Sequence, residues 1–163
     1  VRPESISQDD SETIDAVLDV VEWSETNNRF YEVVVILQPT SPLRLAEDLD
    51  NALDLFYYSE DADSLVSVNA MSEHPSECLE VVDQGWSYLV SKKRPSGNRQ
   101  TYSQNYYFIN GAIYIASLNF LKSSRSLIKD ESALLFEMPS SRSIDIDEPF
   151  DLKLANYVSG EMN

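Results

Sequence analysis

The sequence predicts an α/β domain with a mostly parallel sheet, and three observations support this fold class. The stretch 33–37 holds five apolar residues, four of them β-branched, and runs directly into a polar turn at 38–44. Such a run is typical of a strand buried on both faces in a sheet flanked by helices. Helical periodicity occurs on both sides of this strand, and a second short apolar run occupies 64–68. This alternation of helices and strands favours a parallel sheet.

Two helices are predicted in the first half of the chain. Asp9 and Glu12 form a capping-box-like pair at the start of the first helix, which ends at Asn27-Asn28. The second helix, 45–58, has acidic residues in its first turn, where the helix dipole favours them. The apolar positions of both helices recur at helical spacing and are expected to face inward: Ile14, Val17, Leu18, Val21, Leu45, Leu49, Ala52, Leu53 and Phe56.

A β-hairpin is predicted after the second apolar run. Two strand-like segments, 79–82 and 86–90, flank the turn Asp83-Gln84-Gly85. A polar and basic stretch, 91–104, follows this hairpin and is expected to be mobile or to close over a ligand.

The last third of the chain contains a second turn signal. Within 106–115, the dipeptide Asn110-Gly111 predicts either another hairpin or a close approach of the backbone to a ligand. A final short strand is predicted at 143–146, and a closing helix at 148–158.

Composition limits the possible function classes. The 163 residues suit one domain, and 42% apolar residues indicate a globular chain. The net charge of −16 argues against a nucleic-acid partner and against binding to an anionic membrane surface. No apolar run approaches the roughly 20 residues needed to cross a bilayer. The only cysteine and the only histidine, Cys78 and His74, disfavour zinc and cysteine–histidine chemistry, and a lone cysteine fits a reducing cytoplasm.

Two groups of polar residues are candidates for ligand binding. Ligands of open α/β sheets lie beyond the carboxyl ends of the strands, so Gln38, Ser41 and Arg44 are expected at the ligand edge. Asp145 and Asp147 are two residues apart, so in a strand their carboxylates would share one face. Paired carboxylates suit Mg²⁺ or another divalent cation. The alternative is that both are solvated or cap the next helix.

A basic cluster stands out in this acidic chain. Lys92, Lys93, Arg94 and Arg99 lie within eight residues. They are able to bind a phosphate or a carboxylate, arginine in a bidentate manner. The alternative is a loop that only improves solubility, and Arg99 beside Gln100 is the strongest binding candidate.

Six segments, in this order, resemble the acylneuraminate (CMP-sialic acid) cytidylyltransferases and their bacterial relatives for legionaminic and pseudaminic acids. The matching segments are Arg2-Pro3 with Asp9-Asp10-Ser11, LQPTSPLR (37–44), His74-Pro75, Arg99-Gln100, NGAIYI (110–115) and IDID (144–147). One element of the family is missing. The glycine- and lysine-rich loop that cradles the triphosphate of CTP has no counterpart, since the sequence has no glycine before Gly85.

The resemblance implies a Rossmann-like nucleotidyltransferase with three α/β/α layers, in which residues 1–163 form a single domain without its N-terminal loop. The implied reaction transfers CMP from CTP to the anomeric hydroxyl of a nonulosonic acid and releases pyrophosphate, with Mg²⁺ as cofactor. The implied assembly is a homodimer in which 74–107 is a β-rich dimerisation excursion. The chain by itself is expected to be poorly active or inactive.

The resemblance also implies a role for each matched residue. The nucleotide would be bound by Arg2, Ser11 and Asn110. The sugar would be bound by Gln38, Ser41, Arg44, Arg99, Gln100 and Tyr114. The catalytic groups would be Asp145 and Asp147, which would hold the metal, and Arg99. Two alternatives remain: a cytidylyltransferase for another ulosonic acid such as KDO, and a non-catalytic dimeric module that binds a ligand without the phosphate loop.

Overall fold

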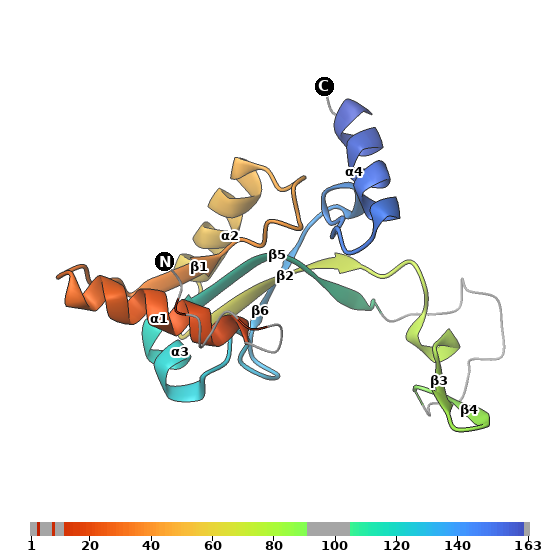
Figure 1. Ribbon diagram of the computed structural model, residues 1–163, viewed down its shortest axis with the longest axis horizontal. Coiled ribbons are helices and arrows are strands. Elements are labelled where there is room, and N and C mark those ends of the chain that lie inside the picture. Colours follow the sequence, from red (N-terminus) through yellow and green to blue (C-terminus); the bar gives the residue numbers. More distant parts are fainter. Residues whose placement is uncertain (1–2, 4–7, 9–11, 91–104, 162–163) are drawn as a thin grey trace.

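The computed structural model describes residues 3, 8, 12–90 and 105–161 of the chain (Figure 1). Its α-helices are α1 (Thr13–Thr26), α2 (Ala46–Tyr58), α3 (Leu118–Ser124) and α4 (Pro149–Glu161). Its strands are β1 (Val33–Ile36), β2 (Ser64–Ala70), β3 (Leu79–Val82), β4 (Gly85–Tyr88), β5 (Tyr107–Ser117) and β6 (Leu134–Glu137). Two short 3₁₀ helices, η2 (Pro75–Glu77) and η4 (Ser140–Arg142), precede β3 and α4.

The main sheet has four strands in the order β1-β5-β2-β6. β5 pairs antiparallel with both β1 and β2, whereas β2 and β6 are parallel. The sheet is therefore mixed, and the prediction of a mostly parallel sheet fails for β5. The cause is the path of the chain: Ala70 at the end of β2 pairs with Tyr107 at the start of β5, so the intervening segment leaves and re-enters at the same end of the sheet.

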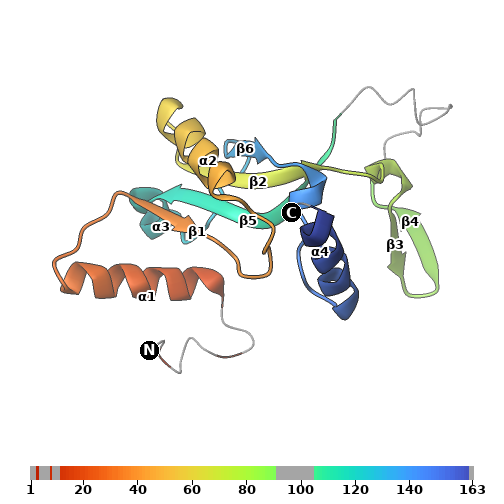
Figure 2. The same ribbon diagram turned by 90° about the horizontal axis from the view of Figure 1, so that it is seen from above.

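Helices cover both faces of the sheet, as the layered α/β prediction requires (Figure 2). On one face, Ala52 and Phe56 of α2 pack against Ile113 and Ile115 of β5. On the other face, α1 and α3 pack against the sheet in a second core that contains Ile14, Ala116 and Leu121. Burial of such apolar side chains supplies the main favourable term of folding, about 1.5–3 kcal/mol for each large side chain.

β1 lies at an edge of the described sheet. All four of its residues are half-buried, so the expectation of a strand buried on both faces is wrong for the described part of the chain. An apolar cavity of about 520 Å³ lies between α1 and β1, lined by valines such as Val17, Val20 and Val34. Among the described residues, no helix has the length and apolar character needed to cross a membrane.

β5 continues through Asn110-Gly111, so the hairpin predicted there is wrong. The strand instead has a large bulge: between the pairs Val66–Tyr114 and Val68–Ile109, Ser67 of β2 faces residues 110–113 of β5. Gly111 adopts φ +72°, a left-handed conformation that glycine tolerates best. The same dipeptide that favours a hairpin therefore favours a bulge when both flanking runs belong to one strand.

Residues 143–146 do not form the predicted strand. In this segment, which has no regular secondary structure, the Ile146 amide donates to the Thr40 carbonyl at 2.9 Å. Because no β-strand is formed, the expectation that Asp145 and Asp147 share one strand face is wrong: Asp145 is half-buried, whereas Asp147 is exposed.

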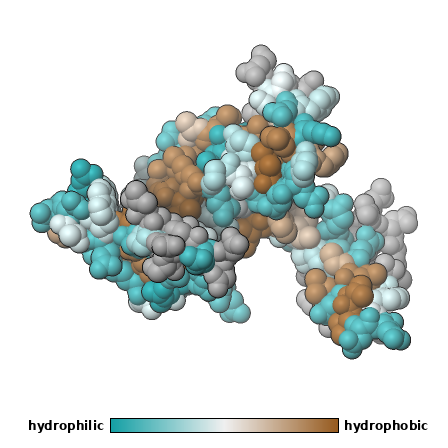
Figure 3. Space-filling view, viewed as in Figure 1, coloured by the Kyte–Doolittle hydropathy of each residue, from teal (hydrophilic) through white to brown (hydrophobic). Residues whose placement is uncertain are grey.

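The predicted hairpin at 79–90 forms from β3 and β4, with Leu79 opposite Tyr88. It stands away from the main sheet in both views (Figures 1 and 2). Every residue of both strands is exposed, and an apolar patch covers the hairpin (Figure 3). The patch consists of Leu79, Val81, Val82, Trp86, Tyr88 and Leu89.

Candidate functional site

The polar turn after β1 is fastened to the bulge of β5. The Arg44 guanidinium donates through Nη1 to the Ala112 carbonyl at 2.6 Å and to the Gln38 carbonyl at 3.4 Å. Ser41 is almost fully buried at 1% exposure, and its hydroxyl makes a long hydrogen bond of 3.5 Å to the Asn110 carbonyl. Both side chains thus hold the turn against β5, and a direct contact of either with a sugar stays a prediction.

Asn110 supports the bulge from inside the protein. Its side-chain oxygen accepts hydrogen bonds from the Ser67 hydroxyl at 2.6 Å and from the Ala112 amide at 3.1 Å. Its side-chain nitrogen donates to the Ser143 hydroxyl at 2.9 Å. Ser67 also accepts from the Ile113 amide at 2.7 Å, which the bulge takes out of the regular ladder. Asn110 is 1% exposed, and its nucleotide contact stays a prediction.

Gly111 brings two candidate residues to one place. A Cβ atom built on Gly111 would lie 2.5 Å from Oε1 of Gln38 and 3.4 Å from Oδ2 of Asp145. The side chains of Gln38 and Asp145 therefore both lie over the glycine backbone, although 107 positions separate them in the chain. Any larger residue at position 111 would displace the Gln38 amide. Two protein side chains therefore approach the Gly111 backbone closely, and its close approach to a ligand stays a prediction.

Asp145 has a buried carboxylate oxygen, Oδ1, without a hydrogen-bond partner in the described structure. Buried polar atoms are nearly always hydrogen-bonded, so this oxygen is an acceptor that is available to a ligand. Asp147 is exposed, and its backbone amide donates to Oδ2 of Asp151 at 3.1 Å. Asp151 also accepts from the Glu148 amide at 2.8 Å, so it caps the first turn of α4.

Tyr114 lies close enough to Asp145 to be influenced by its charge. Burial, and then the negative charge of Asp145, raise the pKa of Tyr114 above its ordinary value of 10.0. The hydroxyl therefore keeps its proton at neutral pH and is able to donate a hydrogen bond. Gln38, Tyr114 and Asp145 together offer an amide, a hydroxyl and a carboxylate at the end of β1, the edge where the sequence predicted the ligand.

An ion pair that sequence reasoning missed links η4 to α2. Arg142 donates to both oxygens of Asp48, through Nε at 2.9 Å and through Nη2 at 2.6 Å. The amide of Leu45, the residue that precedes α2, donates to the same carboxylate at 2.9 Å. No local pattern marks this pair, because its members are 94 positions apart.

The pKa of Asp48 results from opposing effects. Burial raises it, but the hydrogen bonds from Arg142 and the Leu45 amide, together with the charges of Arg142 and Arg44, place it below its ordinary value of 3.8. A carboxyl group with a lowered pKa in the folded state stabilises the fold above its unfolded-state pKa. That contribution disappears as the pH falls through the folded-state value.

We therefore expect the native chain and Asp48→Asn to differ less in their free energy of unfolding as the pH falls from about 7 to about 3. Urea unfolding at a series of pH values measures it. Asp54→Asn, at an exposed position of the same helix, is the control for the general acid sensitivity of so acidic a chain. A difference that is constant across this range would contradict the lowered pKa of Asp48.

Four predicted site residues, Arg2, Ser11, Arg99 and Gln100, lie outside the described residues. Of the predicted residues within the described ranges, the structure brings Gln38, Ser41, Arg44, Asn110, Tyr114 and Asp145 together around the bulge, and leaves Asp147 at the surface. In these ranges, no three histidine, cysteine, aspartate or glutamate side chains form a group suited to hold a metal.

Comparison with known proteins identifies sequence relatives of the chain. No protein-family model matches the chain. The chain is 32% identical over 155 residues to the CMP-N,N'-diacetyllegionaminic acid synthase of Legionella pneumophila, covering 94% of this chain and 65% of the relative. It is 27% identical over its full length to the N-acylneuraminate cytidylyltransferase of Escherichia coli, of which it covers 37%. The chain is homologous to members of the acylneuraminate cytidylyltransferase family.

A solved structure gives independent support for the fold. CMP:2-keto-3-deoxy-manno-octonic acid synthetase, complexed with CTP, superposes with a TM-score of 0.60 over 95% of this chain and 70% of its own. The sequence identity is 16%, so this likeness concerns the fold alone. The chain spans less than two thirds of the length of the curated relatives it matches.

Proposed function

We propose that the protein transfers CMP from CTP to the anomeric hydroxyl of a sialic-acid-like nonulosonic acid and releases pyrophosphate. The observation that carries this proposal is Asp145, whose buried Oδ1 lacks a partner at the end of β1, beside Gln38 and Gly111. The names of the relatives, which include a legionaminic acid synthase and an acylneuraminate cytidylyltransferase, favour this substrate class.

The donor set fits a hard divalent cation such as Mg²⁺. An unpartnered carboxylate oxygen is an acceptor that a cation satisfies, and Mg²⁺ commonly takes one or two protein carboxylates together with ligand phosphates. We assign Asp145 and, two positions later, Asp147 to this role. When bound, the cation neutralises the negative charge of the ligand phosphates, which a chain of net charge −16 would otherwise repel. Because only these two protein carboxylates are assigned to the cation, coordination positions remain for the ligand phosphates.

The chain's own residues position the reactants in this proposal. The Gln38 amide offers a donor and an acceptor to the sugar, and the Tyr114 hydroxyl, which stays protonated, offers a donor. Arg99 and Gln100 are proposed to bind the sugar, Arg99 through the sugar carboxylate. Arg2 and Ser11 are proposed to bind the nucleotide. Arg44 and Ser41 hold the turn that carries Gln38, and Asn110 supports the bulge beneath it. Catalysis by such a site depends on orientation and electrostatic stabilisation.

The segment 74–107 is proposed to form the contact of a homodimer. Its hairpin, β3 with β4, exposes apolar side chains such as Val81 and Trp86, at 77% and 62% exposure. A two-stranded hairpin is marginally stable alone in water, so a partner surface would stabilise it. A second copy of the chain is the partner that the family resemblance implies.

The test is an assay of the natural full-length protein with CTP, Mg²⁺ and each of four sugars: sialic, legionaminic and pseudaminic acids, and KDO. We expect pyrophosphate and a CMP-sugar with at least one of the three nonulosonic acids and a clear preference over KDO. Product only with KDO would replace the proposed substrate. Ligand binding without product in any mixture would favour the alternative of a non-catalytic binding module.

A further inference from the structure

We propose that Arg142 and Asp48 are positioning residues that hold Asp145 in the geometry a divalent cation requires. This inference rests on the proposed metal role of Asp145. It concerns two residues that no sequence motif marks, and it gives the ion pair between them a role in the function of the site in addition to its contribution to stability.

The pair has the geometry of a rigid connection. Both guanidinium nitrogens of the fork, Nε and Nη2, meet the two carboxylate oxygens at 2.9 Å and 2.6 Å. The Asp48 side chain is 4% exposed and the Arg142 side chain 24% exposed. A bidentate arginine–carboxylate pair fixes both distance and orientation, and arginine is suited to buried pairs of this kind.

Arg142, the last residue of η4, lies three residues before Asp145, and the segment between them has no regular secondary structure. Residues 143–146 form no strand. On the other side of Asp145, the Ile146 amide donates to the Thr40 carbonyl at 2.9 Å. Asp145 is therefore held between two fixed points: Arg142, which is bound to Asp48 of α2, and Ile146, which is bound to the polar turn. Metal and catalytic groups need positions held to within about 0.5 Å, and short tethers of this type provide it.

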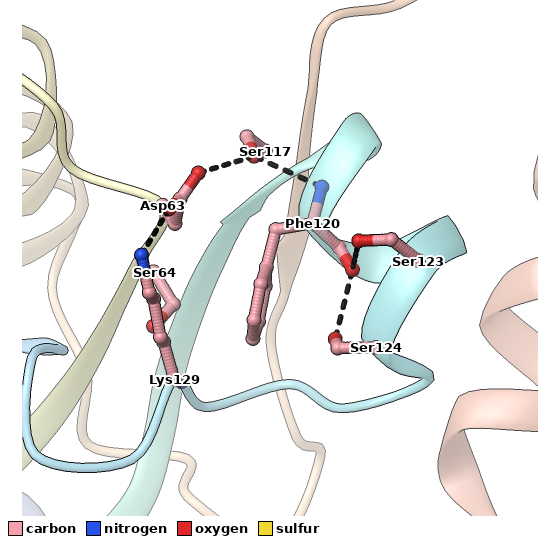
Figure 4. Close-up of polar contacts among 7 residues, drawn as sticks. All are labelled: Asp63, Ser64, Ser117, Phe120, Ser123, Ser124 and Lys129. Atoms are coloured by element: carbon pink, nitrogen blue, oxygen red, sulfur yellow. Dashed lines mark hydrogen bonds and ion pairs between the residues drawn. The ribbon is translucent and has the colours of Figure 1, made fainter.

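The carboxylate of Asp48 links two parts of the site. It also accepts from the Leu45 amide at 2.9 Å, directly after the polar turn that carries Gln38. The start of α2 and the Asp145 segment thus share one anchor. Among the residues that the structure describes, the other ion pairs lack this arrangement: Lys129 and Asp63, for example, form an exposed pair at the opposite end of β2 (Figure 4).

A buried ion pair is a poor device for stability alone, because the cost of removing its charges from water offsets their attraction. Apolar residues of similar size often stabilise a fold equally well, so a buried pair is better explained where it fixes one geometry. This property also supplies the sharpest test. A double variant, Asp48→Leu with Arg142→Met, is expected to preserve the packing while it removes the bidentate connection.

The experiment measures Mn²⁺ affinity by electron paramagnetic resonance on the natural full-length protein, without CTP or sugar, so the readout does not depend on activity. The variants are the double variant, Arg142→Gln, Arg142→Lys and Asp145→Asn, with Lys129→Gln as the matched control. Urea unfolding of each variant establishes that it is folded at the temperature of the measurement.

We expect the double variant and Arg142→Gln to weaken Mn²⁺ binding about 10–100-fold, the range measured for residues that orient metal ligands. Arg142→Lys should give a smaller loss, because it keeps the charge without the fork. Lys129→Gln should bind as the native protein does.

Two results distinguish the failure of this inference from the failure of the proposed function. If Asp145→Asn loses Mn²⁺ but the folded double variant binds as the native protein does, the positioning role is wrong and the metal role stands. If Asp145→Asn binds Mn²⁺ normally, or the native protein does not bind it, the metal role itself is wrong and the positioning role falls with it.

Discussion

Replacement of Asp145 by asparagine is expected to lower the turnover of CMP-sugar formation on the order of 10²–10³-fold, the loss typical of removing one group that stabilises transition-state charge. Asparagine keeps the size and shape of the side chain but removes the charge and one ligand oxygen. The stability of the protein should stay the same or rise, because Oδ1 of Asp145 makes no hydrogen bond in the described structure that could be lost.

The measurement combines steady-state kinetics at several Mg²⁺ concentrations with the unfolding midpoint. The control is Asp130→Asn, an exposed position beside Lys129 at the opposite end of the sheet, for which neither quantity should change. A stabilised but inactive Asp145→Asn variant would identify Asp145 as a residue kept for function at a cost in stability. Near-native turnover at ordinary Mg²⁺ concentration would contradict the metal assignment.

The elements with strong local signals were predictable from sequence. The apolar run at 33–37 became β1, Val33–Ile36, and the helical pattern at 45–58 became α2, Ala46–Tyr58. The hairpin of β3 and β4 followed from its turn residues. In each case the information lies within a few neighbouring residues, where periodicity and turn chemistry operate.

Strand direction and register were not predictable in this way. The antiparallel direction of β5 follows from the path of the segment between Ala70 and Tyr107, which begins and ends at one end of the sheet. The bulge at residues 110–113 depends on Ser67, whose hydroxyl replaces a missing ladder partner. The segment 143–146 looked like a strand by composition but lies on the polar turn instead, through Ile146 and Thr40. Contacts between residues far apart in the sequence determine these properties, so local propensity does not predict them.

The site was predictable in part for the same reason. Gln38 and Asp145 were candidates because the ends of strands and paired carboxylates have chemical meaning by themselves. Their meeting over Gly111 required the fold. The ion pair of Asp48 and Arg142 was not predictable from sequence. An aspartate in the first turn of a helix is common, and a single arginine belongs to no recognisable motif.

Gly111 is the second position at which a single substitution should have a large effect. Gly111→Ala is expected to destabilise the fold by about 1–2 kcal/mol, the cost of holding a residue with a Cβ in the left-handed region. It should also raise the sugar KM about 10-fold, because its Cβ would lie 2.5 Å from Oε1 of Gln38 and displace that amide. Urea unfolding and sugar kinetics on the full-length protein measure the two effects.

Gly160→Ala is the matched control, because a Cβ at this helical position meets nothing within 4 Å. It should raise stability by about 0.5–1 kcal/mol, so the same substitution has opposite signs at the two glycines. A Gln38→Ala change added to Gly111→Ala removes the clash but not the backbone strain. The double variant should therefore regain part of the stability while sugar binding stays weak. Native stability and KM in Gly111→Ala would mean that the bulge relaxes freely and that Gln38 is not held there.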